Sequence, residues 1–130
     1  MLHNKISIFT FRTFPHIDKL HQDFDTVFVF GKLRSDLEKF KQIIAKEKPD
    51  IIVGFARSTQ EFSSFETRAV NMFHGKTLCG ENKEYSLFVP DIAGTGIEMS
   101  QKQTTSFCNW TAYRLAEFLH RNSLKKQLIL

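Results

Sequence analysis

Residues 26–55 read TVFVFGKLRSDLEKFKQIIAKEKPDIIVGF, and this stretch decides the fold class. Its two ends, 26–30 and 51–55, are continuous runs of β-branched, aromatic and aliphatic residues, which are typical of strands buried on both faces. Between them, capping-box spacing at 35–38, an apolar stripe at helical spacing and a terminating Pro49 predict a helix. The stripe consists of Leu37, Phe40, Ile43 and Ile44. A strand, a helix and a strand with short joins form a βαβ unit, so we expect an α/β fold whose sheet is at least partly parallel.

Segments on either side of this unit also carry secondary-structure signals. We expect further strands at 6–11, 67–73, 84–89, 97–100 and from 128 onward, a short helix at 16–24 and a long helix at about 106–122. This alternation predicts a three-layer α/β sandwich, in which helices flank a mixed, largely parallel sheet in the phosphorylase/hydrolase-like manner. Ligands of such proteins bind beyond the carboxyl ends of the strands, and the polar loop 56–65 follows one of them.

Length and composition limit the kind of protein. A chain of 130 residues with 42% hydrophobic residues suits one domain, 1–130, that needs neither disulfides nor a structural metal. Cys79 and Cys108 are far apart and form no C-x-x-C motif, which argues against a disulfide scaffold or zinc ribbon and favours a reducing compartment. The sequence shows no targeting signal and no apolar run of the ~18 residues that a membrane span needs. We therefore expect a cytoplasmic protein with no membrane partner, no metal and no cofactor.

The charge does not point to nucleic acid as a partner. Lysine and arginine number 18 against 14 acidic residues, and residues 101–130 carry the whole excess of +4. The first 100 residues are balanced, so no broad basic face is available to follow phosphates. The terminal cations are those expected of a solvated helix end.

Two residues stand where a parallel α/β sheet places reactive groups. Cys108 follows a strand and a polar loop, so its thiol falls in the first turn of a helix, where unpaired N–H groups and the helix dipole lower the pKa of a thiol. Glu66 follows the loop after the strand at 51–55, and the topology brings it to the same sheet edge. A carboxylate there could orient an imidazole in a Cys/His/acid triad. Taken alone, Cys108 could instead be a small core residue and Glu66 a solvated one.

Four segments resemble, in the same order, motifs of one enzyme family. ISIFTFRTF at 6–14 resembles a first strand with its G-F-x-P-F loop, and PDIIVGFA at 49–56 resembles a P-D-x-(V/I)-(V/I)-x-G-x-A strand. FETRAVN at 65–71 is similar to an E-x-x-A-x-N segment, and Ser100 followed by FCNW at 107–110 is similar to S-x-x-A-G-x-x-x-C-N. These are motifs of the pyroglutamyl peptidases, also called pyrrolidone-carboxylate peptidases.

The resemblance implies a cysteine omega-peptidase that removes an N-terminal pyroglutamyl residue from peptides. Cys108 matches the nucleophile of the family and Glu66 its triad acid, while Phe11 and Phe14 match the aromatic residues that grip the lactam ring. The implied partner is a peptide with N-terminal pyroglutamate. Family members often associate, and an apolar sheet edge is expected here, so the sequence also predicts a homo-oligomer.

The sequence departs from the family where catalysis depends on it. The histidine of the family lies in an H-x-P motif after the strand that follows the cysteine-bearing helix, and this chain ends at Leu130, so we expect a domain truncated at its C-terminus. His120 lies 12 residues along the same helix, roughly 18 Å from Cys108, and His74 is typical of a turn. Gln103-Thr104 stands where the family has Ala-Gly. Loss of an acid–base group costs about 10²–10⁴-fold in rate, so we expect little or no turnover.

Three functions remain open at this stage. The first is a pyroglutamyl-peptidase-like cysteine hydrolase that is impaired or inactive because its histidine is absent. The second is a non-catalytic relative that acts as a binding or scaffold domain. The third is a small nucleic-acid binder that uses the C-terminal cations, and it would show salt-dependent retention on DNA or RNA.

Overall fold

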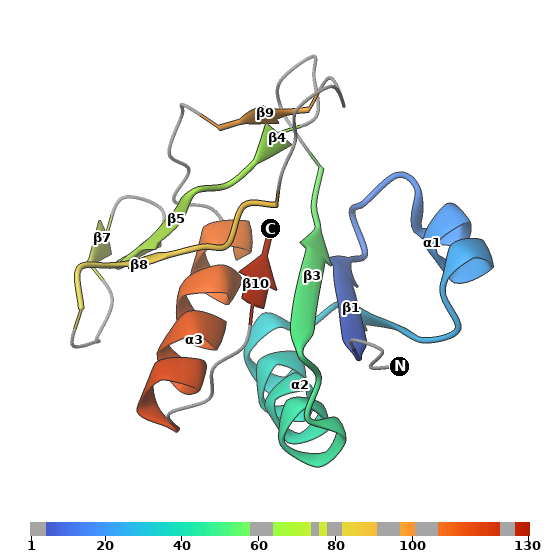
Figure 1. Ribbon diagram of the computed structural model, residues 1–130, viewed down its shortest axis with the longest axis horizontal. Helices are drawn as coiled ribbons and strands as arrows, with labels where there is room; N and C mark the ends of the chain where they lie inside the picture. The colour runs from blue at the N-terminus through green and yellow to red at the C-terminus, as the bar shows by residue number, and fades with distance from the viewer. Residues whose placement is uncertain are drawn as a thin grey trace.

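A parallel sheet forms the centre of the computed structural model, which describes residues 5–57, 64–73, 76–77, 82–90, 97–100, 107–122 and 127–130. Four strands lie in the order β10-β3-β1-β2, and each is parallel to its neighbours (Figure 1). They are β1 (Ile6–Phe11), β2 (Val27–Phe30), β3 (Ile51–Phe55) and β10 (Gln127–Ile129). The predicted α/β class and its parallel sheet are confirmed.

The βαβ unit predicted from residues 26–55 is present. β2 leads into α2 (Leu33–Glu47), which returns the chain to the amino end of β3. The crossover skips one position, because β1 lies between β2 and β3 in the sheet. β2 is therefore an edge strand, and Val27, Phe28 and Val29 are only half-buried. The expectation that this strand is buried on both faces was wrong, because only one side of it has a neighbouring strand.

The start of α2 differs from the one that capping-box spacing predicts. Its N-cap is Lys32, whose side chain makes no capping bond. The carboxylate of Asp36 instead accepts the backbone N–H groups of Gly31 and Lys32 at 2.7 and 2.8 Å. These two bonds, from Gly31 first and then from Lys32, hold the pKa of Asp36 below its ordinary value. The N-terminal end of α2 is therefore capped by an acidic side chain from within its first turn, and the N-cap residue itself does not contribute.

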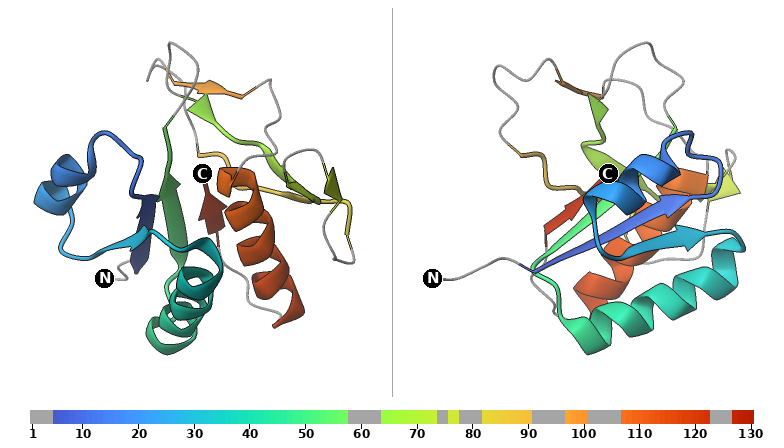
Figure 2. Two further views of the ribbon diagram at one scale, coloured as in Figure 1. Left: turned by 180° about the vertical axis from the view of Figure 1, so that it is seen from behind. Right: turned by 90° about the vertical axis from the view of Figure 1, so that its right-hand side faces the viewer.

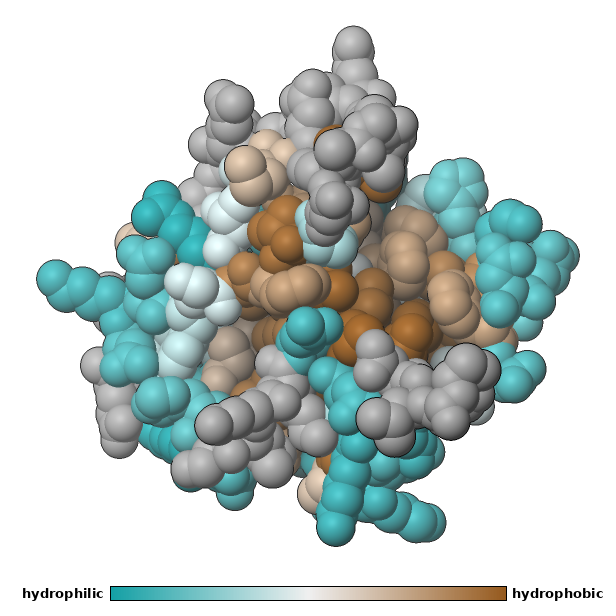
Figure 3. Space-filling model, viewed as in Figure 1, coloured by the Kyte–Doolittle hydropathy of each residue, from teal (hydrophilic) through white to brown (hydrophobic). Residues whose placement is uncertain are grey.

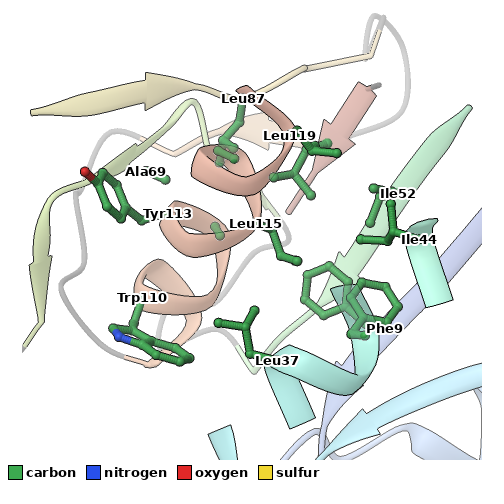
Figure 4. Packing of buried hydrophobic residues seen from close by; sticks show 14 of the residues in the cluster. Phe9, Leu37, Ile44, Ile52, Ala69, Leu87, Trp110, Tyr113, Leu115 and Leu119 are labelled. Atoms are coloured by element: carbon green, nitrogen blue, oxygen red, sulfur yellow. The ribbon is translucent and has the colours of Figure 1, made fainter. Parts of the chain in front are cut away.

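Helices cover both faces of the sheet. α2 and α3 (Phe107–Arg121) lie on one side and α1 (Ile17–Asp23) lies on the other, so the predicted three-layer arrangement is present (Figures 1 and 2). The core is aromatic: the Phe9 ring centroid lies 5.4 Å from that of Phe40 and 5.6 Å from that of Phe30. Figure 4 shows how side chains of the sheet, α2 and α3 meet in this core. Eight of the described phenylalanines belong to this core or pack against it.

One glycine is required by the packing of β1 beside β3. Gly54 is aligned with Phe9 in the register of the two strands. The Phe9 ring, which is fully buried, occupies the space that a Cβ on Gly54 would need. A residue without a side chain at this position therefore allows the ring to enter the core.

A pair of short antiparallel strands, a two-stranded sheet of its own, lies next to β10. β5 (Arg68–Val70) pairs with β8 (Glu84–Ser86). Two backbone hydrogen bonds of 3.0 Å join the segments that flank this pair to β10 and the residue after it. Glu66 N–H donates to the carbonyl oxygen of Leu130, and Phe88 N–H donates to that of Leu128. α3 packs against this pair as well as against α2, and most of its side chains are buried. The antiparallel part of the predicted mixed sheet lies here.

The predicted strands in this region are shorter in the structure. The strand expected at 67–73 is divided at Asn71 into β5 and β6 (Met72–Phe73), because the two parts pair with different strands. β8 covers only part of 84–89, and the strand expected at 97–100 is β9 (Glu98–Met99). β6 pairs with β7 (Lys76–Thr77), and β4 (Ser64–Phe65) pairs with β9.

Part of the apolar surface remains open to solvent. In the view of Figure 3, hydrophobic side chains gather over the sheet and hydrophilic side chains surround them. Among the described residues, Ile6, Phe88 and Met99 are exposed to 50%, 41% and 55%. Apolar surface of this kind is typical of contact surfaces between proteins. The homo-oligomer predicted from the sequence stays a prediction.

Candidate functional site

Cys108 lies in the first turn of α3, as the sequence predicts. It is the second residue of the helix and is half-buried, with side-chain packing against the core. The first turn of α3 contains no acidic residue. A helix start without acidic residues in its first turn is the kind of position that lowers the pKa of a thiol in proteins, which is the reason the sequence singled out Cys108.

The start of α3 is positioned by the carboxyl end of β1. Phe107 packs against Phe11, the last residue of β1, with ring centroids 5.0 Å apart and planes at 67°. The carbonyl oxygen of Phe107 also accepts a hydrogen bond from the Thr111 hydroxyl at 2.8 Å. Cys108 consequently lies at the edge of the sheet where ligands of parallel α/β proteins bind.

Asn109 ties the start of α3 to the chain segment that carries Glu66. Its side chain is buried, with 2% exposure. Its Oδ1 accepts the backbone N–H of Val70 at 2.9 Å, and its Nδ2 donates to the carbonyl oxygens of Val70 and Met72 at 3.0 and 2.9 Å. Cys108 and the strand that follows Glu66 are therefore held together by an amide side chain whose role the sequence analysis did not assign. A polar asparagine among the apolar residues at the start of the helix, Phe107, Cys108 and Trp110, was the signal that could have found it.

Glu66 is half-buried at the same sheet edge. Its backbone N–H donates to the carbonyl oxygen of Leu130 at 3.0 Å, at the carboxyl end of β10. Burial raises the pKa of the Glu66 carboxyl above its ordinary value, and a hydrogen bond from the Ser100 side chain acts in the opposite direction. Ser100 is itself held in place, because its N–H donates to the Phe65 carbonyl at 2.7 Å. The structure thus adds Ser100 as a partner of the predicted acid.

The two predicted aromatic residues lie in different environments. Phe11 is inside the core, with 2% exposure, and it contacts the rings of Phe9, Phe30 and Phe107. Phe14 is half-buried in the loop after β1, and its ring lies 6.1 Å from that of Phe55 at the end of β3. Of the two, only Phe14 presents part of its ring to solvent.

The described histidines lie at α1 and in the last turn of α3. His16 precedes α1, where its ring lies 5.7 Å from that of Phe14, and His21 is in α1. His120 is in the last turn of α3, at the opposite end of the helix from Cys108, and contacts Tyr85. His3, His74, Cys79 and the Gln103-Thr104 pair lie outside the described residues.

Two further findings concern what the site could hold. Within the ranges that the structure describes, no three His, Cys, Asp or Glu side chains are grouped so that they could bind a metal ion. No helix in those ranges is both long enough and apolar enough to cross a membrane.

The fold and the site define a class of protein. The chain has a parallel sheet, a cysteine in the first turn of a helix and a half-buried carboxyl near the carboxyl end of β10, and in α/β proteins of this kind ligands bind beyond the carboxyl ends of the strands. Solved structures make the fold more specific: it is the fold of the pyroglutamyl peptidases. This agrees with the resemblance of the four sequence segments.

Three of these structures show how far the similarity extends. The pyrrolidone carboxyl peptidase from Thermococcus litoralis has a TM-score of 0.74 at 17% identity, over 98% of this chain and 74% of that one. The pyroglutamyl peptidase I from Bacillus amyloliquefaciens has a TM-score of 0.74 at 16% identity, over 98% and 81%. A variant pyrrolidone carboxyl peptidase from Pyrococcus furiosus has a TM-score of 0.73 at 17% identity, over 96% and 78%. No protein-family model and no curated protein sequence matches the chain.

Proposed function

We propose that this protein is a divergent relative of the pyroglutamyl peptidases whose site binds the N-terminal pyroglutamyl end of a peptide and hydrolyses it slowly or not at all. One observation carries the proposal: within the fold of the pyroglutamyl peptidases, Asn109, the residue after Cys108, bonds the backbone of the strand that follows Glu66. Core packing alone does not require a thiol at this helix start or a half-buried carboxyl in the segment that is bonded to the helix.

The proposed recognition relies on apolar contact. The pyroglutamyl lactam ring carries no charged amine, so an aromatic face and a few backbone hydrogen bonds are enough to select it. The partly exposed ring of Phe14, supported by Phe55, provides that face. Phe11 acts from behind, because it is buried and holds the Phe107 ring and the start of α3 in place.

The proposed chemistry is attack of the Cys108 thiolate on the carbonyl carbon of the peptide bond that follows the pyroglutamyl residue; the lactam ring stays intact. A C–S bond forms, the amide C–N bond breaks, and the departing amine needs a proton; water then hydrolyses the thioester. The start of α3 supports the thiolate, and Glu66 would orient a base. Of the three described histidines, none is in the first turn of α3 or in the segment that carries Glu66, so we expect the proton transfer to be poorly assisted and turnover to be slow.

The test separates binding from catalysis. A peptide with N-terminal pyroglutamate should bind in a calorimetric titration, whereas the same peptide with N-terminal proline, whose ring carries a charged amine, should bind at least about tenfold more weakly, a difference of about 1.4 kcal/mol. A Phe14→Ala variant should lose this preference. A fluorogenic pyroglutamyl amide should give a slow rate that Cys108→Ala abolishes.

The outcomes of this test are distinct. Equal binding of both peptides would overturn the proposed recognition. Binding with equal background rates for wild type and Cys108→Ala would identify the non-catalytic relative, which is the second function that the sequence left open.

A further inference from the structure

β2 forms an edge of the sheet that takes no part in the candidate site. It ends the sheet on the side opposite β10, and β1 is the strand that pairs with it. The right-hand view of Figure 2 looks toward this edge and shows β2 running between α1 and α2. The outer side of β2 is therefore a place where another strand can pair.

The backbone groups of Val27 and Val29 point away from the sheet. In a strand, successive residues direct their N–H and C=O groups to opposite edges. The Phe30 carbonyl oxygen accepts the Arg12 N–H at 3.1 Å, so Phe30 and Phe28 face β1 and the two valines face outward. Within the described ranges, the N–H and C=O groups of these valines have no hydrogen-bond partner. Unpaired groups of this kind are a template for a further strand.

β2 lacks the features that protect edge strands in natural proteins. Such strands usually carry a charge, a proline or a bulge. Residues 26–30 read TVFVF, and their register with β1 is continuous, without a bulge. Val27, Phe28 and Val29 are half-buried, so part of their apolar surface is open to solvent. An open apolar edge is typical of a strand that pairs with another chain.

The charges at the two ends of β2 indicate which strand fits it. Asp25 precedes the strand and Lys32 follows it, and both are exposed. A second copy that runs antiparallel brings each Asp25 toward the Lys32 end of its neighbour, whereas a parallel copy brings like charges together. The strand is thus complementary to itself in the antiparallel direction, and a twofold axis relates two copies paired in this way.

We propose that the outer edge of β2 is a dimer interface, at which a second copy of the chain pairs antiparallel to β2 about a twofold axis at Phe28. This register places Val27 opposite Val29 of the second copy, so the outward N–H and C=O groups of both valines are paired. It also places the two Phe28 rings next to each other, each packed against Phe40 of its own copy at 5.2 Å. The two sheets then form one continuous sheet, and the twofold contact closes the assembly at two chains.

The first experiment uses the wild-type chain. Sedimentation equilibrium over a roughly hundredfold range of protein concentration should show a reversible change from the 15.1 kDa monomer to a dimer. Amide hydrogen exchange at Val27 and Val29 should be at least about tenfold slower in the dimer, whereas exchange at Phe28 and Phe30, which face β1, should change little. A monomer at every concentration, particles larger than a dimer, or a dimer without added protection of the two valines would overturn the proposal.

The second experiment removes one outward N–H group. Val27 is the first residue of β2, a position where a strand tolerates proline, so Val27→Pro should fold and its dimer should be at least about tenfold weaker. Val27→Thr is the matched control, because it keeps both the N–H group and the β-branched shape, and it should dimerise as wild type does. A folded Val27→Pro variant that dimerises as strongly as Val27→Thr would overturn the proposal.

An exchange of charges tests the direction of pairing. Asp25→Lys and Lys32→Glu should each weaken the dimer about threefold or more at low salt, because each brings like charges together at both ends of the paired strands. The double variant restores opposite charges and should dimerise about as strongly as wild type. A double variant weaker than both single variants would overturn the antiparallel pairing and the proposal with it.

Discussion

At the scale of single residues, the place of Cys108 in α3 decides its reactivity. A thiol in the first turn of a helix without acidic neighbours in that turn is stabilised as a thiolate. At about pH 6–7, we expect iodoacetamide to alkylate Cys108 of the folded protein several-fold faster than it alkylates Cys79. The rate at Cys108 should also exceed the rate at either cysteine in urea-unfolded protein. Mass spectrometry of the two peptides measures both rates. An unreactive Cys108 in the folded protein would mean that it acts only as a core residue.

Glu66 makes the stability of the protein depend on pH. Its carboxyl has an ordinary pKa of 4.5, and burial raises the pKa in the folded state. Between these two values the folded protein binds more protons than the unfolded one, so the stabilisation is complete below about pH 4.5 and is lost as pH rises through the raised pKa. Glu66→Gln should therefore become more stable relative to wild type as pH increases through this interval. Urea unfolding at several pH values measures the difference.

A second variant tests the cause of this shift. The Ser100 side chain lowers the pKa of Glu66 by donating a hydrogen bond, so Ser100→Ala should move the pH-dependent loss to higher pH. A profile that Glu66→Gln leaves unchanged would assign the pH dependence to another group.

At the scale of elements, Asn109 joins α3 to β5 and β6. Removing its amide leaves partly buried backbone groups of Val70 and Met72 without these hydrogen bonds, so Asn109→Ala should lower the free energy of unfolding by about 2–4 kcal/mol. Asn122→Ala is the control, because Asn122 is exposed near the end of the same helix and should cost less than about 0.5 kcal/mol. If both variants lost the same free energy of unfolding, the hydrogen bonds of Asn109 would not be what holds α3 to β5 and β6.

The N-terminal turn of α2 gives a prediction of the opposite pH sign. Asp36 has a lowered pKa because it accepts two backbone N–H bonds, so its contribution is present above pH 3.8 and is lost as pH falls through the lowered pKa. Asp36→Ala should cost about 1 kcal/mol near neutral pH and progressively less in acid. Asp23→Ala, which removes only an exposed pair with Lys19, should cost no more than about 0.5 kcal/mol at any pH.

At the scale of the whole molecule, the aromatic core depends on the close approach of β1 and β3. A Cβ at Gly54 overlaps the Phe9 ring, so Gly54→Ala should destabilise the protein by about 1–3 kcal/mol. Gly31→Ala is a control of the same chemistry, since the nearest atom to its Cβ would be Asp36 Oδ2 at 3.8 Å, an ordinary contact. It should change stability by no more than about 0.5 kcal/mol. Thermal unfolding of the two variants measures the contrast, and similar midpoints would contradict it.

Much of the molecule could be predicted from local sequence patterns. The βαβ unit, the helix that begins at Phe107 and the last strand at Gln127–Ile129 follow from the periodicity of apolar residues, which reports the faces that an element buries. The same patterns misjudged the exposure of β2 and the start of α2. The exposure of β2 depends on strand order, which is set by residues far apart in the sequence. The start of α2 depends on hydrogen bonds of one side chain, that of Asp36. The periodicity of apolar residues contains neither kind of information.

The sequence alone determined the class of fold and the position of Cys108 at a helix start, because both depend on neighbours within a few residues. Only the tertiary structure decided that Phe11 is buried while Phe14 is partly exposed, and that Asn109 links Cys108 to the Glu66 segment. These features arise where elements distant in the chain pack together. Their free energy depends on which two surfaces come into contact, and local sequence patterns do not contain that information.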